Sequence, residues 1–195
     1  MRAAAPVQCY GLRVITTSSP VSDDSGASPD TSGTHDPQAA IWVAFATAGN
    51  ASAFCKSWLS LQCTQITGVR AGLLLLREPG AESYVPAAVW PEGNSDVSRL
   101  GKAAEQTLAS RRGVVLPGDG PQGRIVHAGL PVEIGTELLG AAVLELTPRP
   151  DPALKAVLRQ MLWGAGWLET WIRREQSGRT ERLLQRSATG MDILQ

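Results

Sequence analysis

The side chains that can do acid–base or nucleophilic chemistry are few and scattered in this sequence. The histidines are His35 and His127, and the cysteines are Cys9, Cys55 and Cys63. None of them has the spacing of a zinc site, and no serine lies in the G-x-S-x-G pattern of a nucleophile elbow. The HExxH and Walker A patterns are also missing. We therefore expect no catalytic residue, no metal site and no cofactor, in a protein that is not a self-sufficient enzyme.

Two of the cysteines lie eight residues apart on what the spacing of apolar residues predicts to be one helix. At 100° per residue, Cys55 and Cys63 are about 80° apart around that helix. Small packing residues explain this placement better than a redox pair does. Three cysteines also leave at least one thiol unpaired, which favours a reducing compartment.

The bulk composition fits one folded domain with appendages. The chain has 195 residues, of which 43% are hydrophobic and 18% charged, and its net charge is zero. Zero net charge gives no long-range attraction to nucleic acid. The dense apolar stretches 73–76 and 138–146 are far shorter than the roughly 20 residues of a membrane span. Since the first residues also lack the apolar core of a secretory signal, we expect a cytoplasmic protein.

Composition divides the chain into three parts. Residues 1–49 are expected to be largely disordered, because the Ser-, Asp- and Pro-rich linker within them has too little apolar area to offset the entropy of ordering. The short apolar stretch 39–48 shows no clear period and stays unassigned. Residues 50–176 form the predicted domain, and residues 177–195 are expected to be a helical or frayed extension towards a further module.

Apolar periodicity and turn residues define an order of elements in the predicted domain. A helix starts at Asn50, a good N-cap, and Gly68 ends it. Strands 69–77 and 83–90 then form a hairpin. Next comes a helix over 96–112, capped by Ser95 or Asp96 and stopped by Gly113. A short strand over 114–116 leads into an exposed loop over 117–123. A second hairpin of strands 125–134 and 137–147 follows, and then a long helix over 151–176 that is capped by Asp151.

This order of elements resembles that of GAF domains. The segment HAGLPVEIGTELLGAAVLEL, residues 127–146, is similar to the GAF pattern of an apolar-Pro-apolar step, a tight turn and a Gly-containing apolar strand. The resemblance implies an α+β fold, related to PAS and profilin folds, with a central antiparallel sheet flanked by helices and a long C-terminal helix. FCKSWLSLQCTQITGVRAGLLLL, AVWP, RRGVVL and LRQMLWGAGWLETWIRR further resemble the cytoplasmic N-terminal GAF-like region of some bacterial membrane-fusion proteins, the periplasmic adaptors of secretion and efflux systems.

The GAF resemblance also implies where a ligand would bind. In GAF domains the ligand pocket lies between the sheet and the crossing helix, so a mostly apolar pocket for a small apolar or aromatic ligand is implied here. Many GAF folds instead fill this space with their own side chains, and a hydrogen-bonded structural role is the plainer alternative for the histidine. The implied pocket residues are Trp90, Leu100, Ala104, Thr107, Val115 and His127.

The predicted last helix carries two apolar stripes. Trp163, Trp167 and Trp171 lie on nearly the opposite side from the stripe expected to face the sheet. Since one sheet covers only one face, we expect these tryptophans to form an interface with a second copy of the chain or a following domain, or to pack on the first helix or segment 41–43. The stripe expected to face the sheet holds Leu154, Leu158, Met161, Ala165, Leu168 and Ile172.

Two functions fit these predictions. The first is a cytoplasmic GAF-like regulatory or assembly module that makes protein–protein contacts, chiefly homo-oligomeric ones, in a secretion or efflux adaptor, with a small-molecule ligand as an added feature. The alternative is a ligand-binding sensor domain of a bacterial signalling protein, in which the last helix transmits the change.

Overall fold

The computed structural model describes residues 37–78, 80, 82–93, 97–121 and 123–191. The predictions for residues 1–36, which include most of the linker, His35 and Cys9, therefore lie outside the described residues. Within the described part, no helix is both long and apolar enough to cross a membrane.

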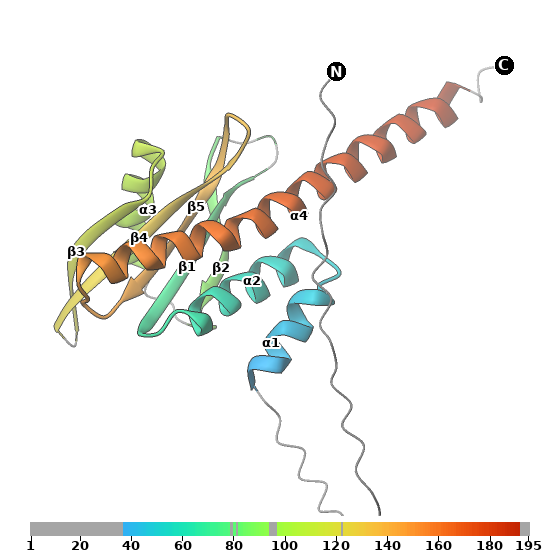
Figure 1. Ribbon diagram of the computed structural model, residues 1–195. Helices are drawn as coiled ribbons and strands as arrows, with labels where there is room; N and C mark the ends of the chain where they lie inside the picture. Colours follow the sequence, from blue (N-terminus) through green and yellow to red (C-terminus); the bar gives the residue numbers. More distant parts are fainter. Residues whose placement is uncertain (1–36, 79, 81, 94–96, 122, 192–195) are drawn as a thin grey trace, which may run out of the picture. The chain divides into compact units, whose positions relative to one another are not determined.

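A five-stranded antiparallel sheet flanked by helices forms the domain (Figure 1), so the predicted α+β class is confirmed. The strands lie in the order β2-β1-β5-β4-β3. Both predicted hairpins are present as the β1–β2 and β4–β5 pairs. The elements are α1 Pro37–Ala46, α2 Ala51–Gln65, β1 Val69–Arg77, β2 Tyr84–Trp90, α3 Ser98–Ser110, β3 Val114–Gly120, β4 Gly123–Ile134, β5 Glu137–Leu146 and α4 Asp151–Met191.

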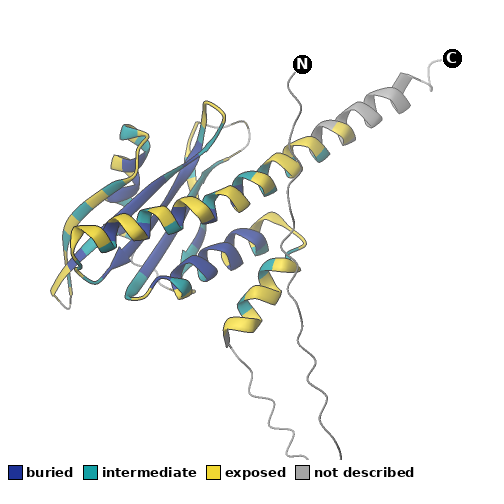
Figure 2. Cartoon of the chain, viewed as in Figure 1, coloured by how far each residue is buried: buried dark blue, intermediate teal, exposed yellow. Residues whose placement is uncertain are grey.

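The helices cover the sheet on both faces. Helices α2 and α4 pack on one face over a large apolar cluster that includes Trp58 and Leu144, while α3 packs on the other face over a smaller cluster that includes Leu73 and Val143. On β5, Ala142 and Leu144 lie in the large cluster and Val143 between them lies in the small one, as the two-residue period of a strand requires. The central strand β5 is consequently buried from Leu139 to Leu146 (Figure 2).

Helix α2 begins as its sequence predicts and packs closely against α4. The Asn50 side chain accepts a hydrogen bond from the Ala53 N–H at 2.9 Å, which confirms it as the N-cap. The indole N–H of Trp58 donates to the Gly164 carbonyl at 2.8 Å. A Cβ at Gly164 would lie 2.2 Å from the Gln62 amide nitrogen, so a larger residue there would require the Gln62 side chain to move.

Two predicted boundaries were wrong because sheet pairing and helix continuity override local turn signals. The predicted loop 117–123 is largely strand, since β3 pairs with β4 as far as Gly120, and a sheet-edge strand tolerates Pro117. Helix α4 does not end near Gln176 but continues to Met191, which agrees with the helical alternative for the extension that starts at residue 177. A glycine such as Gly178 costs a helix only about 1 kcal/mol and does not by itself stop it.

Other helix ends also differ from their predictions. Segment 37–46, expected within the largely disordered part, contains α1. Helix α3 ends at Ser110 with Arg111 in the left-handed region at φ 51°, so Gly113 is not its stop. The predicted caps Ser95 and Asp96 lie outside the described residues. At the start of α4, the Ala153 N–H donates to the Pro150 carbonyl. Asp151 is therefore the first residue of the helix and not its cap, so the helix begins one residue earlier than predicted.

Candidate functional site

Four of the six implied pocket residues meet between α3 and the sheet. Leu100 and Ala104 lie in the apolar cluster beneath α3, and Thr107 of α3 and His127 of β4 are also buried. Trp90 instead packs against the cluster under α2 and α4. Val115 is 38% exposed, and its cross-strand partner Ala128 belongs to that same cluster. These two residues therefore do not join the other four.

The middle of the α3 layer is tightly packed. Leu73, Leu100 and Val143 are each at most 2% exposed. The Thr107 hydroxyl donates to the Ala103 carbonyl at 2.7 Å, and a Cβ at Gly129 would come within 2.1 Å of the Thr107 Oγ1. The helix therefore rests directly on the strand, and a ligand can reach this layer only at its edges.

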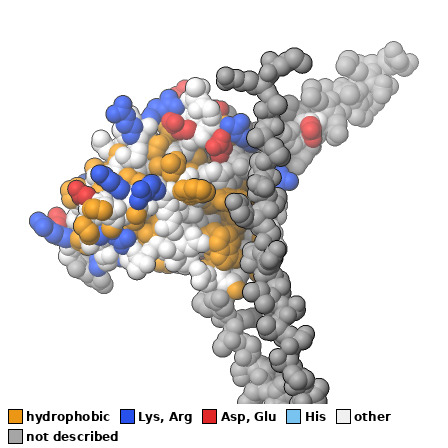
Figure 3. All heavy atoms as spheres, viewed as in Figure 1, with side chains coloured by type: hydrophobic (Ala, Val, Ile, Leu, Met, Phe, Trp, Pro, Cys, Tyr) orange, Lys and Arg blue, Asp and Glu red, His pale blue; other side chains and the backbone are white. Residues whose placement is uncertain are grey.

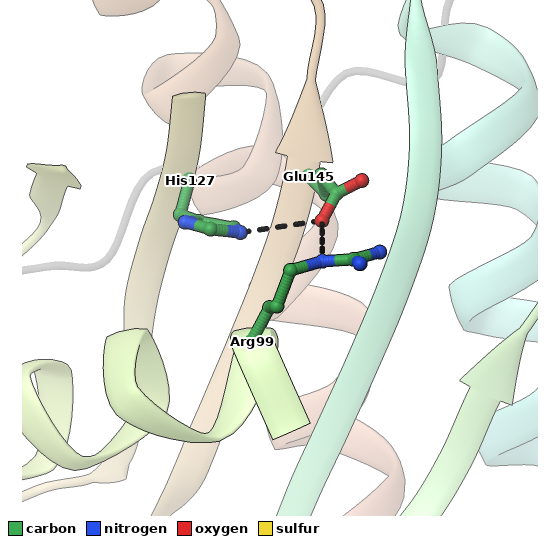
Figure 4. A network of polar contacts seen from close by, with 3 residues as sticks. All are labelled: Arg99, His127 and Glu145. Atoms are coloured by element: carbon green, nitrogen blue, oxygen red, sulfur yellow. Dashed lines mark hydrogen bonds and ion pairs between the residues drawn. The ribbon is translucent and has the colours of Figure 1, made fainter. Parts of the chain in front are cut away.

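At one edge of this layer lies a cluster of polar side chains, which we call the α3 polar cluster: Arg99, His127 and Glu145 (Figure 4). His127 and Glu145 are cross-strand partners on β4 and β5. The His127 Nε2 lies 3.3 Å from the Glu145 Oε2, and the Arg99 Nε donates to the same oxygen at 3.3 Å. Three elements therefore converge on one carboxylate oxygen.

The α3 polar cluster is buried on its sheet side and reachable on its helix side. The side chains of His127 and Glu145 are 8% and 5% exposed, whereas that of Arg99, in the first turn of α3, is 32% exposed. Burying a carboxylate costs several kcal/mol unless partners compensate for it. Of the three side chains, that of Arg99 is the most accessible to a group arriving from solvent.

Sequence reasoning found one member of this cluster and missed the other two. Glu145 follows Val143 by two residues and so points to the same face of the sheet, towards α3. A lone glutamate inside the apolar run GAAVLEL was the available signal. Nothing local points to Arg99, because its contact with Glu145 depends on how α3 lies across the sheet.

The two described cysteines have the environment of packing residues. Burial raises the pKa of the Cys55 thiol to about 11 and raises that of Cys63 as well. Both thiols are therefore protonated near neutral pH and are poor nucleophiles. Within the part of the chain that the structure describes, no group of three or more His, Cys, Asp or Glu side chains is placed to hold a metal ion.

One glycine pattern went unnoticed in the sequence analysis. Residues 118–123, GDGPQG, match G-x-G-x-x-G. The dinucleotide-binding form of this pattern follows a strand and opens a helix, whose N-terminus binds the phosphates. Here it lies in the hairpin between β3 and β4, so it lacks that context.

The outward face of α4 is a second notable surface, which we call the Trp face: Trp163 and Trp167 of α4 with Trp42 of α1, whose ring contacts the Phe45 ring that also meets Trp167. Trp163 is 84% and Trp167 65% exposed. Apolar side chains are visible on the side of the domain that α4 crosses (Figure 3). Exposed apolar residues gathered in this way commonly mark an interaction surface.

The structure separates the three tryptophans of the predicted stripe. Trp171 is partly buried and stacks on Phe54 of α2, with ring centroids 4.9 Å apart and an interplanar angle of 13°. Trp167 meets Phe45 of α1 edge-to-face at 6.1 Å and stays largely exposed. Packing within the chain thus covers Trp171 in part, Trp167 slightly, and Trp163 hardly at all. On the sheet side, Leu154, Met161 and Leu168 are buried as predicted.

Comparisons with known proteins give a likeness in structure only. No family model matches the sequence, and no curated protein matches it significantly. Among solved structures, the GAF domain of the Acinetobacter phosphoenolpyruvate-protein phosphotransferase aligns over 73% of this chain and 93% of its own, with a TM-score of 0.52 and 12% identity. The fold is GAF-like. That result confirms the fold implied by the sequence resemblance.

Two further GAF structures show weaker likeness to this GAF-like chain. The GAF domain of a Coxiella burnetii phosphoenolpyruvate-protein phosphotransferase has a TM-score of 0.47 at 15% identity, over 72% of this chain and 94% of its own. A GAF domain/HD domain protein from Geobacter sulfurreducens has a TM-score of 0.44 at 16% identity, over 64% of this chain and 95% of its own. None of these three is described as a membrane-fusion adaptor, so they give the adaptor resemblance no support.

Proposed function

We propose that this chain is a non-enzymatic regulatory module that binds a small molecule at the α3 polar cluster and transmits the binding through α4. The observation that carries the proposal is the buried Glu145 carboxylate, which His127 and Arg99 contact from two other elements. The GAF-like fold supports it too, because the cluster lies between the sheet and the crossing helix, where GAF domains bind their ligands.

The cost of burying this cluster favours a binding role over a purely structural one. The face of the sheet under α3 is otherwise apolar, and well-packed apolar side chains stabilise a core as well as buried ion pairs do, or better. Arg99 is also the most accessible member, so it can meet a ligand without opening the layer. We therefore propose a small ligand with an apolar or aromatic body and one hydrogen-bonding group, held beside Arg99 and His127.

Strand β4 links the cluster to α4. His127 faces α3, while the next residue, Ala128, lies in the apolar cluster to which Val157 and Met161 of α4 belong. A ligand that shifts His127 therefore displaces the strand on which α4 packs. We propose that this strand couples the ligand site to the helix, in the cytoplasmic setting that the sequence favours.

The test is a thermal-shift screen of the full chain against a panel of amino acids, nucleosides and aromatic carboxylic acids. We expect at least one compound to stabilise the wild type by more than about 1 kcal/mol, and Glu145→Gln and His127→Gln to lose that response. Glu105→Gln, which changes an exposed glutamate on α3, should keep it. An empty screen, or hits that survive both cluster variants, would reject the proposal.

A second candidate function, the assembly module, is favoured by the Trp face. Gly166 lies three residues from Trp163 on the exposed side of α4, and a Cβ there would meet nothing within 4 Å. Packing among the described residues thus gives no reason for this glycine. A two-fold axis between the two positions would place each Trp163 over Gly166 of the second copy, which makes the surface self-complementary.

The size of the Trp face suits a modest homodimer. Covering its three tryptophans on both copies would bury on the order of 1,000 Å², near the lower end for specific interfaces. Sedimentation velocity should show a concentration-dependent dimer that Trp163→Ser and Gly166→Leu both weaken. Val115→Ser, which removes an exposed apolar side chain elsewhere, should leave it unchanged. A wild type that stays monomeric at high concentration would contradict self-association.

The secretion or efflux adaptor setting of such an assembly module rests on the sequence resemblance alone. Crosslinking the chain in cells would test it, since an adaptor role requires contact with components of an export system. Partners from signal transduction would favour the sensor instead.

A further inference from the structure

A cavity lies on the opposite side of the sheet from the α3 polar cluster, at the end of the β1–β2 hairpin. Its volume is about 570 Å³, which is within the range of small-molecule sites. Residues of α2, α4 and strands β1, β2 and β5 line it. The cavity therefore belongs to the α2/α4 side and shares none of the cluster's residues.

The inner wall of this cavity is apolar and held in place by the core. Trp171 and Ile172 of α4 face Pro86 of β2 and Leu139 of β5 across it, with Cys55 of α2 in the same wall. The Trp171 ring is fixed by its stack on Phe54. A flat or extended apolar body can lie in this space and exclude water from the indole, which is otherwise only partly buried.

The rim of the cavity is acidic. The charged residues that line it are one arginine and three glutamates, which leaves two negative charges in excess. Arg77 makes an ion pair with Glu137, so the positive charge already has a partner. Glu175 lies on α4 one turn beyond Trp171, and Glu78 follows the end of β1. The rim therefore favours a cation over an anion.

We propose that this cavity binds a small amphipathic amine, with its apolar body against Trp171 and Ile172 and its ammonium group near Glu175. The site is separate from the proposed α3 ligand site and does not depend on it. Ile172 is the last residue of α4 among those packed against the core cluster. A bound amine would therefore contact both the β1–β2 hairpin and the last part of α4 that packs on the sheet. These contacts would stabilise the packing of α4 at that point.

The test is an NMR titration of the full-length protein with three probes that share one body: 4-phenylbutylamine, 4-phenylbutyrate and 4-phenylbutan-1-ol. At up to about 10 mM probe we expect the amine to bind at least about five-fold more tightly than the acid, with shifts at Cys55, Ala87 and Ile172. Glu175→Gln should remove the preference for the amine. Glu181→Gln, on the same helix but outside the cavity, should retain it.

A second pair of variants tests the cavity by volume. Val85 lines it from edge strand β2 and is 40% exposed, so Val85→Trp should fill it without disturbing the core and weaken amine binding at least about five-fold. Val115→Trp makes the same change on edge strand β3 at 38% exposure, away from the cavity, and should have no effect. The proposal is overturned if the amine fails to bind, if it binds no better than the acid, or if Val85→Trp leaves it unaffected.

Discussion

The two faces of the sheet are built differently. On the α2/α4 face, a large cluster of apolar side chains is buried around Trp58, and its polar contacts serve close helix packing, as in the hydrogen bond from Trp58 to Gly164. On the α3 face, a small apolar cluster adjoins the buried polar side chains of His127 and Glu145. The contrast indicates that the first face supplies most of the stability. The second face contributes less to the free energy of unfolding, because it contains a buried polar site.

The largest expected effect comes from removing the centre of the α2/α4 face. Trp58 is 1% exposed, so Trp58→Ala should lower the free energy of unfolding by about 4 kcal/mol, through lost burial and a remaining cavity. Glu145→Gln on the other face should cost only about 1 kcal/mol, because Arg99 is partly solvated. Urea denaturation of both variants measures the difference. Equal losses would break the comparison between the faces.

A smaller effect should appear at high pH on the α2/α4 face. The pKa of Cys55 rises on folding from 9.0 to about 11 because the thiol is buried. Between these values the unfolded chain loses the proton that the native state keeps, so stability falls as pH rises, by up to about 2 kcal/mol. Cys55→Ala should have a flatter stability profile between about pH 9 and 11. If the profiles of variant and wild type are parallel, the thiol does not titrate as its burial requires.

The smallest effect distinguishes the inner side of α4 from its outer side. Gly164→Ala places a methyl group against Gln62 and should destabilise the fold. Gly166→Ala meets open space and should stabilise the monomer by about 0.5–1 kcal/mol, because alanine favours helix. Thermal unfolding at low protein concentration measures both changes. A loss of stability in both variants would show that Gly166 has an intramolecular role.

The sequence predicted elements whose signals are local. Asn50 and the strands 69–77 and 137–147 were identified from a capping side chain and from apolar runs bounded by turns, and the structure bears them out to within one residue. Helix α1 was not identified because its ten residues lack a clear apolar face. The strand character of residues 117–120 was missed because it comes from pairing with β4, which overrides the turn preferences of proline and glycine.

The candidate site was less predictable than the fold because it is formed by contacts between elements that are distant in the sequence. His127 was chosen from the resemblance. Its contact with Glu145 depends on the β4–β5 register, and the contact of Arg99 with Glu145 depends on how α3 packs across the sheet. Trp90 and Val115 were grouped with them although neither packs in the α3 layer. Side chains brought together by strand pairing and helix docking leave no local spacing to find.

The most direct test of the sensor proposal is to map, by NMR, any compound that stabilises the wild type in the metabolite screen. We predict that its shifts centre on Arg99, His127 and Glu145, extend along β4 to the Met161 region of α4, and disappear in Glu145→Gln while that variant stays folded. Shifts confined to the Trp face or to the cavity beside Trp171, with binding unchanged in Glu145→Gln, would contradict the proposal.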